Sequence, residues 1–321
     1  MTSVDAAQAP GVGIQGKVLP RYQDLPEISE LGVRHAWGLL PNEAGTLAKV
    51  GQADVVAGAK LVSQGLTIPL NLAINAFDPP LFGRATLEHS IIQPTRIDAE
   101  DVINGFNPQA SSQLDGLAHV RAREFGYFGG IATLEEARDK IGMHHWATRG
   151  IAGRGVLLDL EAFDQNSGTT AGPFACKPYG VEDLLTVARA QGVELRTGDI
   201  LLFRTGWAAS FLKLSTEERE NVGGWNGLRA DEEMAAFLWD QGISLVGSDN
   251  PAVEDAPGDR SVGSLHRRLI PSLGLPLMEL LDLERLAIAC QERGSWEFFF
   301  VSVPLYLEGA VSSPANAMAI L

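Results

Sequence analysis

The sequence predicts an α/β fold with mixed sheets and crossover helices, and two observations carry this prediction. In the second half of the chain, short apolar runs alternate with segments of helical spacing, an order typical of parallel strands joined by crossover helices. In the first half, short alternating runs are closed by Pro79 and Pro80, which favours β-structure.

The expected elements follow one another along the chain. Residues 1–30 are rich in Ala, Gly, Gln and Pro without periodicity, and we expect a loosely attached N-terminal arm there. The remaining residues, 31–321, suit a single large domain. Within it we expect β-structure over 65–92, strands at Gly155–Leu160, Asp199–Arg204, Ile243–Gly247 and Trp296–Leu307, and helices at Val181–Gln191 and Asp231–Gln241. A glycine follows each helix as a plausible C-cap.

Charge and composition exclude several classes of protein. Acidic residues outnumber basic ones by 40 to 25, and a net charge of −15 repels phosphate backbones and anionic lipid, so we expect no nucleic acid and no membrane surface as partner. The longest apolar run, Phe298–Leu307, is broken by Pro304 and is about half of what a bilayer requires. Residues 1–20 lack the basic start and apolar core of a secretory signal.

The two cysteines, Cys176 and Cys290, are too few for a Cys-based zinc site. Without an export signal, the expected compartment is the reducing cytoplasm, where both thiols stay free. The phosphate-binding, dinucleotide-binding, nucleophile-elbow and zinc-protease patterns GxxxxGK[ST], GxGxxG, GxSxG and HExxH are absent from the sequence.

The densest polar grouping extends from Gln109 to His119 (QASSQLDGLAH). Gln113 and Asp115 are two residues apart and Gln109 is four further back, so in an extended segment their side chains point to one side. Asp115 and His119 are four apart, across a glycine that allows a turn. Such a set suits Mn²⁺, Mg²⁺ or Zn²⁺, because carboxylate and amide oxygens are hard ligands and imidazole is borderline. On spacing alone, a polar loop whose amides satisfy backbone groups is the favoured alternative.

A second grouping combines His266, in the run Ser-Leu-His-Arg-Arg, with Glu279 between Met278 and Leu280. A carboxylate in apolar surroundings needs a partner, and a metal ion is one way to supply it. The alternative places Glu279 in solvent at the edge of an amphipathic helix, and the spacing does not decide between the two. His145 follows another histidine, and because adjacent side chains diverge, at most one of the two is expected to face a site.

Taken in order, the motifs resemble the metal-dependent cyclase family, which includes bacterial kynurenine formamidase, isatin hydrolase and manganese-dependent dienelactone hydrolases. The segment Gln109–His119 has the frame of the family motif HxGTHxDxPxH. The similarity covers most of the chain, and its other segments are Trp37-Gly38, Asn42–Leu47, Pro79–Arg84, Arg149–Asp159, Arg196–Asp199, Arg204–Trp207, Gly247–Glu254 and Pro304–Asn316.

The resemblance implies a compact fold of the swivelling β/β/α type over 31–321, with an oligomer, a homodimer or homotetramer, as the expected assembly. It further implies that Asp115 is the central metal ligand and His119 the general acid/base. His266 and Glu279 match the later ligands of the family.

Gln109 and Gln113 stand where the family has its two early histidines, and we expect them to be metal ligands as well. Because an amide oxygen is a weaker and harder ligand than imidazole, the two replacements favour a single Mn²⁺, with Zn²⁺ as the second choice. His145 is a candidate for a compensating base or ligand.

The leading hypothesis is a metal-dependent hydrolase that opens or cleaves a cyclic or N-acyl amide, or a lactone, in a small-molecule substrate. The ion would lower the pKa of a bound water while His119 moves the proton, since histidine titrates near neutral pH. Trp37, Phe82 and Trp207 are candidate walls for a flat apolar substrate, although core packing is the commoner role of an aromatic side chain. The alternatives are a metal-dependent cyclase or dehydratase and a non-catalytic small-molecule-binding protein.

Overall fold

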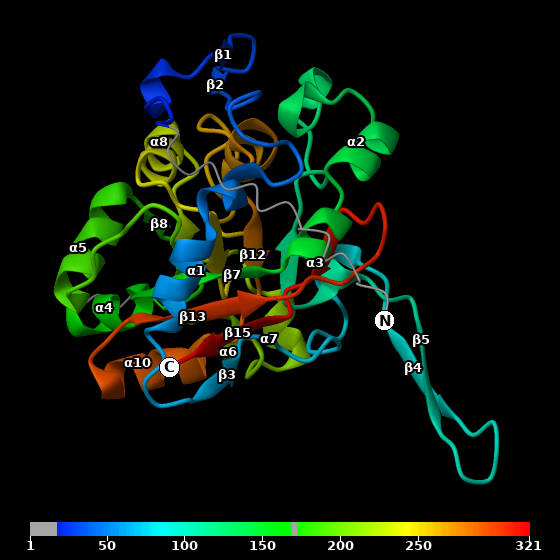
Figure 1. The fold of residues 1–321 in the computed structure, drawn as a ribbon. Coiled ribbons are helices and arrows are strands. Elements are labelled where there is room, and N and C mark those ends of the chain that lie inside the picture. Colours follow the sequence, from blue (N-terminus) through cyan, green and yellow to red (C-terminus); the bar gives the residue numbers. More distant parts are fainter. Residues whose placement is uncertain (1–17, 169–171) are drawn as a thin grey trace, which may run out of the picture.

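A nine-stranded mixed sheet organises the chain in the computed structural model, which describes residues 18–168 and 172–321 (Figure 1). The strand order is β14-β6-β12-β11-β9-β7-β13-β15-β3. Helices connect and cover the strands, so the α/β class with a mixed sheet and crossover helices is confirmed. Among the described residues, no helix has both the length and the apolar character to cross a membrane.

The centre of the sheet is parallel, as the alternating second half of the sequence predicts. Its strands are β7 (Ile151–Asp159), β9 (Ile200–Arg204), β11 (Leu245–Ser248) and β12 (Leu277–Glu279). These strands are buried on both faces, which explains their continuous apolar runs.

Two crossover helices match the predicted ranges closely. Helix α5 (Val181–Gln191) ends at Gly192, whose left-handed backbone (φ 68°) forms the expected C-cap. Helix α8 (Glu232–Asp240) begins after Asp231, whose side chain accepts a hydrogen bond from the backbone N–H of Met234.

Antiparallel strands complete the sheet on both sides. Next to β7 lie β13 (Glu297–Ser302), β15 (Ala317–Ile320) and β3 (Thr67–Pro69). The strand predicted over Trp296–Leu307 therefore ends at Ser302, because Pro304 cannot donate to the ladder. At the opposite end, β6 (Gln113–Asp115) lies between β12 and β14 (Ser312–Pro314) and is antiparallel to both.

Shorter elements surround the sheet. The further helices are α1 (Gln52–Ala59), α2 (Leu134–Lys140), α3 (His144–Arg149), α4 (Leu160–Asn166), α6 (Trp207–Phe211), α7 (Thr216–Glu220), α9 (Leu265–Arg268) and α10 (Glu284–Arg293). Small strand pairs are β1 (Glu27–Ile28) with β2 (Val33–Arg34), and β8 (Pro178–Tyr179) with β10 (Gly227–Leu228). Short 3-10 turns lie at Tyr22–Asp24, Gly45–Lys49, Leu81–Gly83, Pro108–Ala110, Arg123–Phe125 and Phe128–Gly130, and a π-helical turn at Leu269–Leu273.

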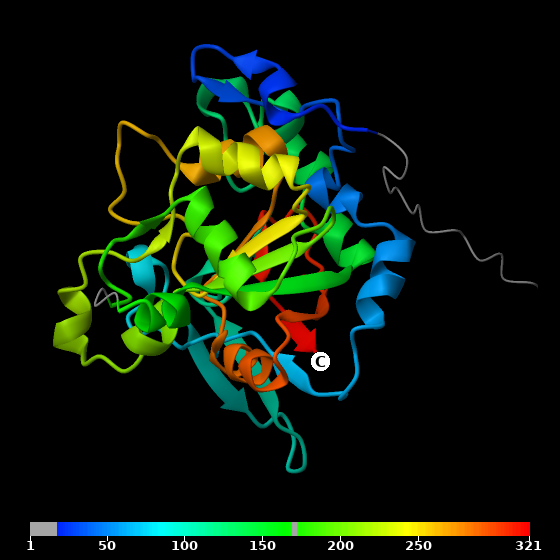
Figure 2. The same ribbon diagram turned by 90° about the vertical axis from the view of Figure 1, so that its left-hand side faces the viewer.

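The predicted N-terminal arm lies partly outside the described residues, which begin at Val18. From there the chain packs beside α8, as both views show for the dark blue segment and the yellow helix (Figures 1 and 2). Tyr22 is buried and its backbone N–H donates to Asp240 Oδ1 at 2.8 Å, while Trp239 Nε1 donates to Pro20 O at 2.9 Å. Residues 20–30 are therefore attached to the core instead of lying loosely, because Tyr22, Leu25 and Ile28 are buried.

The region 65–92, predicted as β-structure, contains β3 and the first strand of a hairpin. This hairpin pairs β4 (Glu88–Ile92) with β5 (Glu100–Asn104) in antiparallel register. It projects away from the body of the molecule in both views, and every residue from Glu88 to Asp101 is exposed (Figures 1 and 2).

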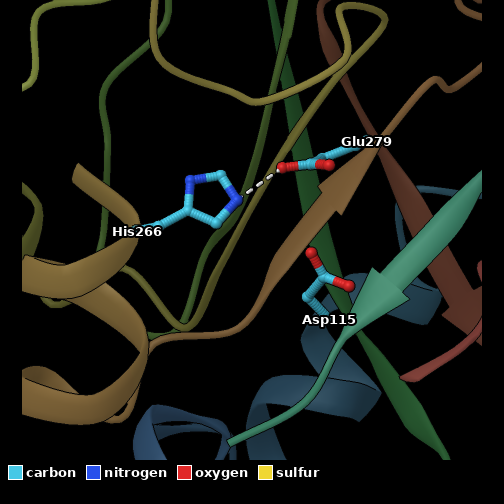
Figure 3. A group of neighbouring side chains, drawn as sticks. All are labelled: Asp115, His266 and Glu279. Carbon is cyan, nitrogen blue, oxygen red and sulfur yellow. Dashed lines mark ion pairs between the residues drawn. The ribbon is translucent and has the colours of Figure 1, made fainter. Parts of the chain in front are cut away.

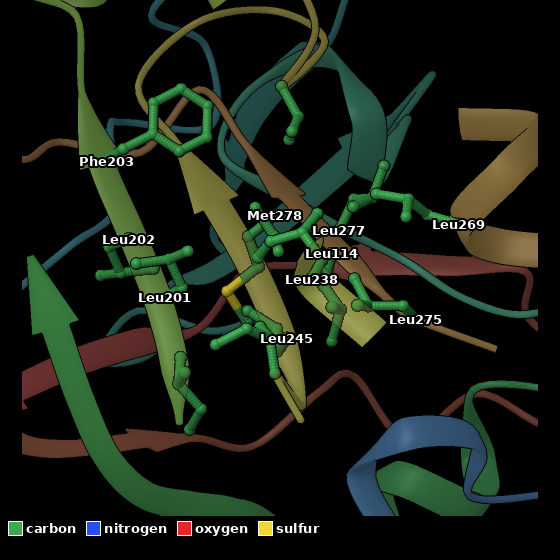
Figure 4. Packing of buried hydrophobic residues seen from close by; sticks show 14 of the residues in the cluster. Leu114, Leu201, Leu202, Phe203, Leu238, Leu245, Leu269, Leu275, Leu277 and Met278 are labelled. Atoms are coloured by element: carbon green, nitrogen blue, oxygen red, sulfur yellow. The ribbon is translucent and has the colours of Figure 1, made fainter. Parts of the chain in front are cut away.

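The main apolar core lies on both faces of the sheet, and Figure 4 shows its part around β9, β11 and β12. Leu202, Leu245 and Met278 come from these three strands, and Leu114 of β6 reaches the same cluster. Leu114 and Met278 are directly opposite each other in the β6–β12 ladder, so they share one face of the sheet. Their neighbours along both strands must point to the other face.

Candidate metal centre

Three polar side chains gather on the face of β6 and β12 opposite to Leu114. Gln113 and Asp115 are two residues apart in β6, so their side chains point the same way, as their spacing predicts. Glu279 is paired directly with Gln113 across the ladder and joins them on that face. All three are at most 2% exposed, so Glu279 is not a solvated helix edge.

His266 reaches this cluster from α9. Figure 3 shows its imidazole pointing at Glu279, with Asp115 beside them on β6. His266 Nε2 lies 2.9 Å from Glu279 Oε1. One ligand atom each of Asp115, His266 and Glu279 lie within 4.8 Å of one another, a spacing that a metal ion could bridge. The structure therefore brings together three of the predicted ligands from three separate elements.

Glu254 holds the other side of the imidazole, and sequence reasoning missed this role. Its Oε2 lies 2.6 Å from His266 Nδ1 and also accepts the backbone N–H of His266 at 3.1 Å. Ser264 Oγ donates to Glu254 Oε1 at 3.0 Å. A carboxylate on one imidazole nitrogen that leaves the other for a metal is a common support for a histidine ligand. The segment Gly247–Glu254 belongs to the family resemblance, but its spacing gives no sign of this contact.

The charges of this cluster require a cation or a proton between them. Burial raises the pKa of Glu279 to about 7, although the adjacent His266 opposes this shift. Burial also acts to lower the pKa of His266, but the carboxylates of Glu254 and Glu279 outweigh it and raise that pKa well above its usual value. A divalent cation can replace the protons that these groups would otherwise share, because metal ligands bind in their deprotonated form, so the arrangement is suited to such an ion.

The two glutamines both contact the carboxylates. Gln113 Nε2 donates to Glu279 Oε2 at 2.6 Å and lies 3.4 Å from Asp115 Oδ2, whereas Gln109 Nε2 donates to Asp115 Oδ1 at 2.8 Å. As placed, the amide nitrogens face the cluster, and a nitrogen of this kind is not a metal ligand. Gln113 Oε1, however, is buried without a hydrogen-bond partner among the described residues. A buried oxygen acceptor without a partner beside two carboxylates fits a cation that prefers oxygen ligands.

His119 lies at the more open side of the cluster, with 28% of its side chain exposed. The predicted turn is present: the His119 N–H donates to Gly116 O at 3.0 Å. A Cβ on Gly116 would lie 2.9 Å from Val311 O, so only glycine fits this turn. His119 Nε2 is 3.6 Å from Asp115 Oδ2 and 3.2 Å from Gln109 Nε2. The imidazole therefore adjoins the cluster without being one of its three closely spaced ligands.

A cluster of aromatic side chains begins directly after Glu279. Leu280 has a left-handed backbone (φ 54°), and its side chain packs into a second apolar cluster with Trp207 and Phe211. Trp207 stacks on Phe211 with ring centroids 4.4 Å apart and meets Trp225 edge-on at 6.2 Å. The exposed ring of Phe82 contacts Trp225 at 6.0 Å. Of the two predicted substrate walls in this aromatic group, Phe82 is exposed, whereas Trp207 is 1% exposed and packs in the core, as the alternative role of an aromatic side chain predicts.

The third predicted substrate wall, Trp37, and the candidate base or ligand His145 lie elsewhere. Trp37 stacks beside His35, and its Nε1 donates to Pro271 O at 2.7 Å, which ties the indole to the π-helical turn. His145 is in α3, where its Nε2 lies 3.0 Å from Asp139 O, and it does not join the cluster. The compensating role suggested for His145 is therefore not supported by its position, because α3 turns the imidazole toward α2.

Comparisons with known proteins agree with the fold. The sequence model of a family described as "Putative cyclase" matches residues 65–255. A crystal structure of "a novel cyclase" is 27% identical with a TM-score of 0.78 and covers 89% of this chain and 99% of its own. Isatin hydrolase A from Labrenzia aggregata, bound to benzyl benzoate, has 14% identity and a TM-score of 0.55, with coverage of 83% and 97%. Isatin hydrolase A from Ralstonia solanacearum has 16% identity and a TM-score of 0.57, with coverage of 79% and 91%. No curated protein sequence matches the chain.

Proposed function

The chain belongs to the cyclase family, and on this premise we propose that it is a metal-dependent hydrolase that opens or cleaves a cyclic or N-acyl amide, or a lactone. The observation that carries the proposal is the convergence of Asp115, His266 and Glu279 within 4.8 Å of one another. Isatin hydrolases share the fold, which supports hydrolysis as the reaction of this chain.

Asp115, His266 and Glu279 would hold the ion, and Gln113 offers a buried oxygen without a partner in the described part of the chain. A bound divalent ion supplies Lewis acidity, which makes water a stronger acid and polarises a carbonyl group. Two carboxylates, amide oxygen and a single imidazole form an oxygen-rich set, which favours Mn²⁺ and leaves Zn²⁺ as the second choice.

His119 would transfer the proton. Gln109 Nε2 lies 3.2 Å from His119 Nε2 and 3.4 Å from His119 Nδ1, and because an amide nitrogen only donates, this contact favours a neutral imidazole whose unprotonated nitrogen accepts. An acceptor nitrogen is what a general base needs to take a proton from water, and the same nitrogen can return it to the leaving group. The partial exposure of His119 leaves it accessible to a small-molecule substrate.

Metal analysis of the purified protein, followed by a screen of amides and lactones with the bound ion present, tests this function. The variants Asp115→Asn and Glu279→Gln should lose most of the bound metal and all turnover. Asp199→Asn is a matched control, since Asp199 is equally buried but pairs with Arg154. A protein that binds neither Mn²⁺ nor Zn²⁺, or that is inert with both, would refute the proposal.

The family description itself supports ring closure as a second candidate reaction. The same metal and the same base could then promote loss of water instead of its addition. Product mass separates the two reactions, because hydrolysis adds the mass of one water molecule and cyclisation does not.

We propose a second copy of the chain as the macromolecular partner, in a homodimer or homotetramer. The β4–β5 hairpin exposes Ile91, Ile97 and Ile103, with exposed fractions of 66%, 92% and 44%. An isolated two-stranded hairpin is at best marginally stable in water, and closed symmetric assemblies are the usual form of soluble oligomers. The cytoplasm remains the expected compartment, in agreement with two free thiols.

A further inference from the structure

Arg84 ends the segment Pro79–Arg84, and its Nη1 is buried without a hydrogen-bond partner among the residues that the structure describes. Within residues 18–168 and 172–321, the guanidinium forms no ion pair either. Guanidinium groups carry five donors and stay charged in proteins, so a half-buried one whose donors have no acceptor is costly to maintain. Such a group is typical of a site that binds an anion.

Contacts connect Arg84 to the metal centre. Its guanidinium faces Phe82, Phe82 meets Trp225, and Trp225 Nε1 donates to the backbone oxygen of Glu254 at 2.9 Å. The carboxylate of Glu254 in turn holds His266. Burial lowers the pKa of the Arg84 guanidinium, whereas the charges of Glu279 and Asp115 act to raise it. It does not pair with either of them. A divalent cation between the carboxylates would neutralise their charge, and Arg84 would then need an anion from outside the protein.

Arg84 contacts one end of the aromatic group formed by Phe82, Trp225, Trp207 and Phe211. Its guanidinium lies 5.0 Å from the ring centroid of Phe82, and Phe82 contacts Trp225. Trp207, which meets Trp225 edge-on, also has a buried Nε1 without a partner in the part of the chain that the structure describes. A cation, flat apolar rings and an unused N–H donor are therefore arranged next to one another.

We propose that Arg84 binds a carboxylate on the substrate, whose planar apolar part lies against Phe82 and Trp225. This inference rests on the proposed function. It narrows the substrates of the proposed hydrolase to acyl compounds that carry a carboxylate. The guanidinium would form a charge-assisted, bidentate pair with that carboxylate. Arg84 then determines specificity, while the hydrolytic chemistry belongs to the metal centre.

Binding of benzoate to the Mn²⁺-saturated protein, with benzamide as the neutral comparison, tests this role by calorimetry. We expect the wild type to bind benzoate at least about tenfold more tightly than benzamide. The carboxylate of benzoate can form a charged hydrogen bond with Arg84, whereas the neutral amide of benzamide cannot. Arg84→Gln should remove this preference, and Arg84→Lys should retain part of it. Equal binding of benzoate by the wild type and Arg84→Gln would overturn the proposal, as would a wild type without any preference.

Arg219→Gln is the matched control, because Arg219 also lies over a ring of the aromatic group, Phe211, at 5.4 Å but donates to Leu212 O. It should keep the benzoate preference. The melting temperature of Mn²⁺-saturated Arg84→Gln should equal or exceed that of the wild type, because an unpaired charge is removed; a lower value would show a structural role and overturn the proposal. A protein that prefers benzoate but cleaves no amide or lactone would refute the hydrolase and leave the anion site standing.

Discussion

Gln113 and Glu279 face each other across the β6–β12 ladder, and the amide of Gln113 donates to the carboxylate of Glu279 at 2.6 Å. A glutamine thus holds a candidate metal-binding carboxylate in place, through a contact that the register of the sheet fixes. Because Gln113 Nε2 also lies 3.4 Å from Asp115 Oδ2, one amide group links the two carboxylates of the candidate centre. The metal preference of this chain should therefore depend on the glutamines as much as on the carboxylates.

Replacing both glutamines by histidine, in the variant Gln109→His/Gln113→His, should shift the preference from Mn²⁺ toward Zn²⁺. Imidazole is a softer ligand than an amide oxygen, so the ratio of Zn²⁺ to Mn²⁺ affinity is expected to rise by about tenfold or more. Competition titrations with a chelating indicator measure this ratio. An unchanged ratio would show that neither position contacts the ion.

Glu254→Gln should weaken metal binding by roughly 10–100-fold without unfolding the protein, because the carboxylate that orients His266 is replaced by a neutral amide. Mn²⁺ titration followed by electron paramagnetic resonance gives the affinity. Glu297→Gln is a suitable control, since Glu297 pairs with Arg154 away from the centre. Wild-type affinity in Glu254→Gln would contradict the positioning role.

His119→Ala should abolish turnover while leaving metal content and folding close to those of the wild type. The side chain is partly exposed, and its polar partners in the described part of the chain are Gln109 and Asp115, so its removal is expected to change the free energy of unfolding by less than about 1 kcal/mol. Measurements of kcat, metal content and urea denaturation on the same preparation distinguish the effects. Retained kcat would eliminate His119 as the acid/base.

Lys49→Met should stabilise the protein near neutral pH. Burial lowers the pKa of Lys49 from 10.5 to about 7, although Asp240 opposes the shift. Between pH 7 and pH 10.5, Lys49 carries a proton in the unfolded chain but not in the folded chain. The free energy of unfolding of the wild type therefore rises with pH in this range, and the lysine lowers it most at pH 7 and below. Urea denaturation at pH 7 should show a gain of roughly 2–4 kcal/mol in Lys49→Met, which shrinks toward pH 10. The reverse trend would show that the lysine is charged when folded.

Ile91→Asp combined with Ile103→Asp should dissociate the expected oligomer. Ile91 pairs with Asp101 and Ile103 with His89, so both isoleucines lie on one face of the hairpin. Sedimentation should then give a lighter species than the wild type, whereas Ser90→Asp on the other face should have a smaller effect. A wild type that sediments as a monomer would contradict self-association through the hairpin.

Local patterns predicted much of the fold and the central part of the site. The helix Val181–Gln191 was predictable because its spacing and its glycine cap are properties of neighbouring residues. The same holds for Gln113 and Asp115, whose common direction follows from the two-residue period of a strand.

Contacts between distant segments were not predictable in this way. Glu254 reaches His266 because a loop and a short helix fold back on the sheet. The spacing of these residues in the sequence does not indicate this contact. The orientation of His145 depends on how α3 packs against α2, and the position of Trp37 depends on the π-helical turn that carries Pro271. The family resemblance supplied the link between Asp115 and Glu279 that spacing left open.

The left-handed backbone at Leu280 lies between the candidate metal centre and the aromatic group. Glu279, before it, is held in the sheet opposite Gln113, whereas the Leu280 side chain packs with Trp207 in the second apolar cluster. Substitutions of the aromatic rings can therefore change the proposed substrate contacts while β12, which carries Glu279, keeps its register. Libraries randomised at Phe82 and Trp225 would therefore offer a starting point for directed evolution of substrate selectivity.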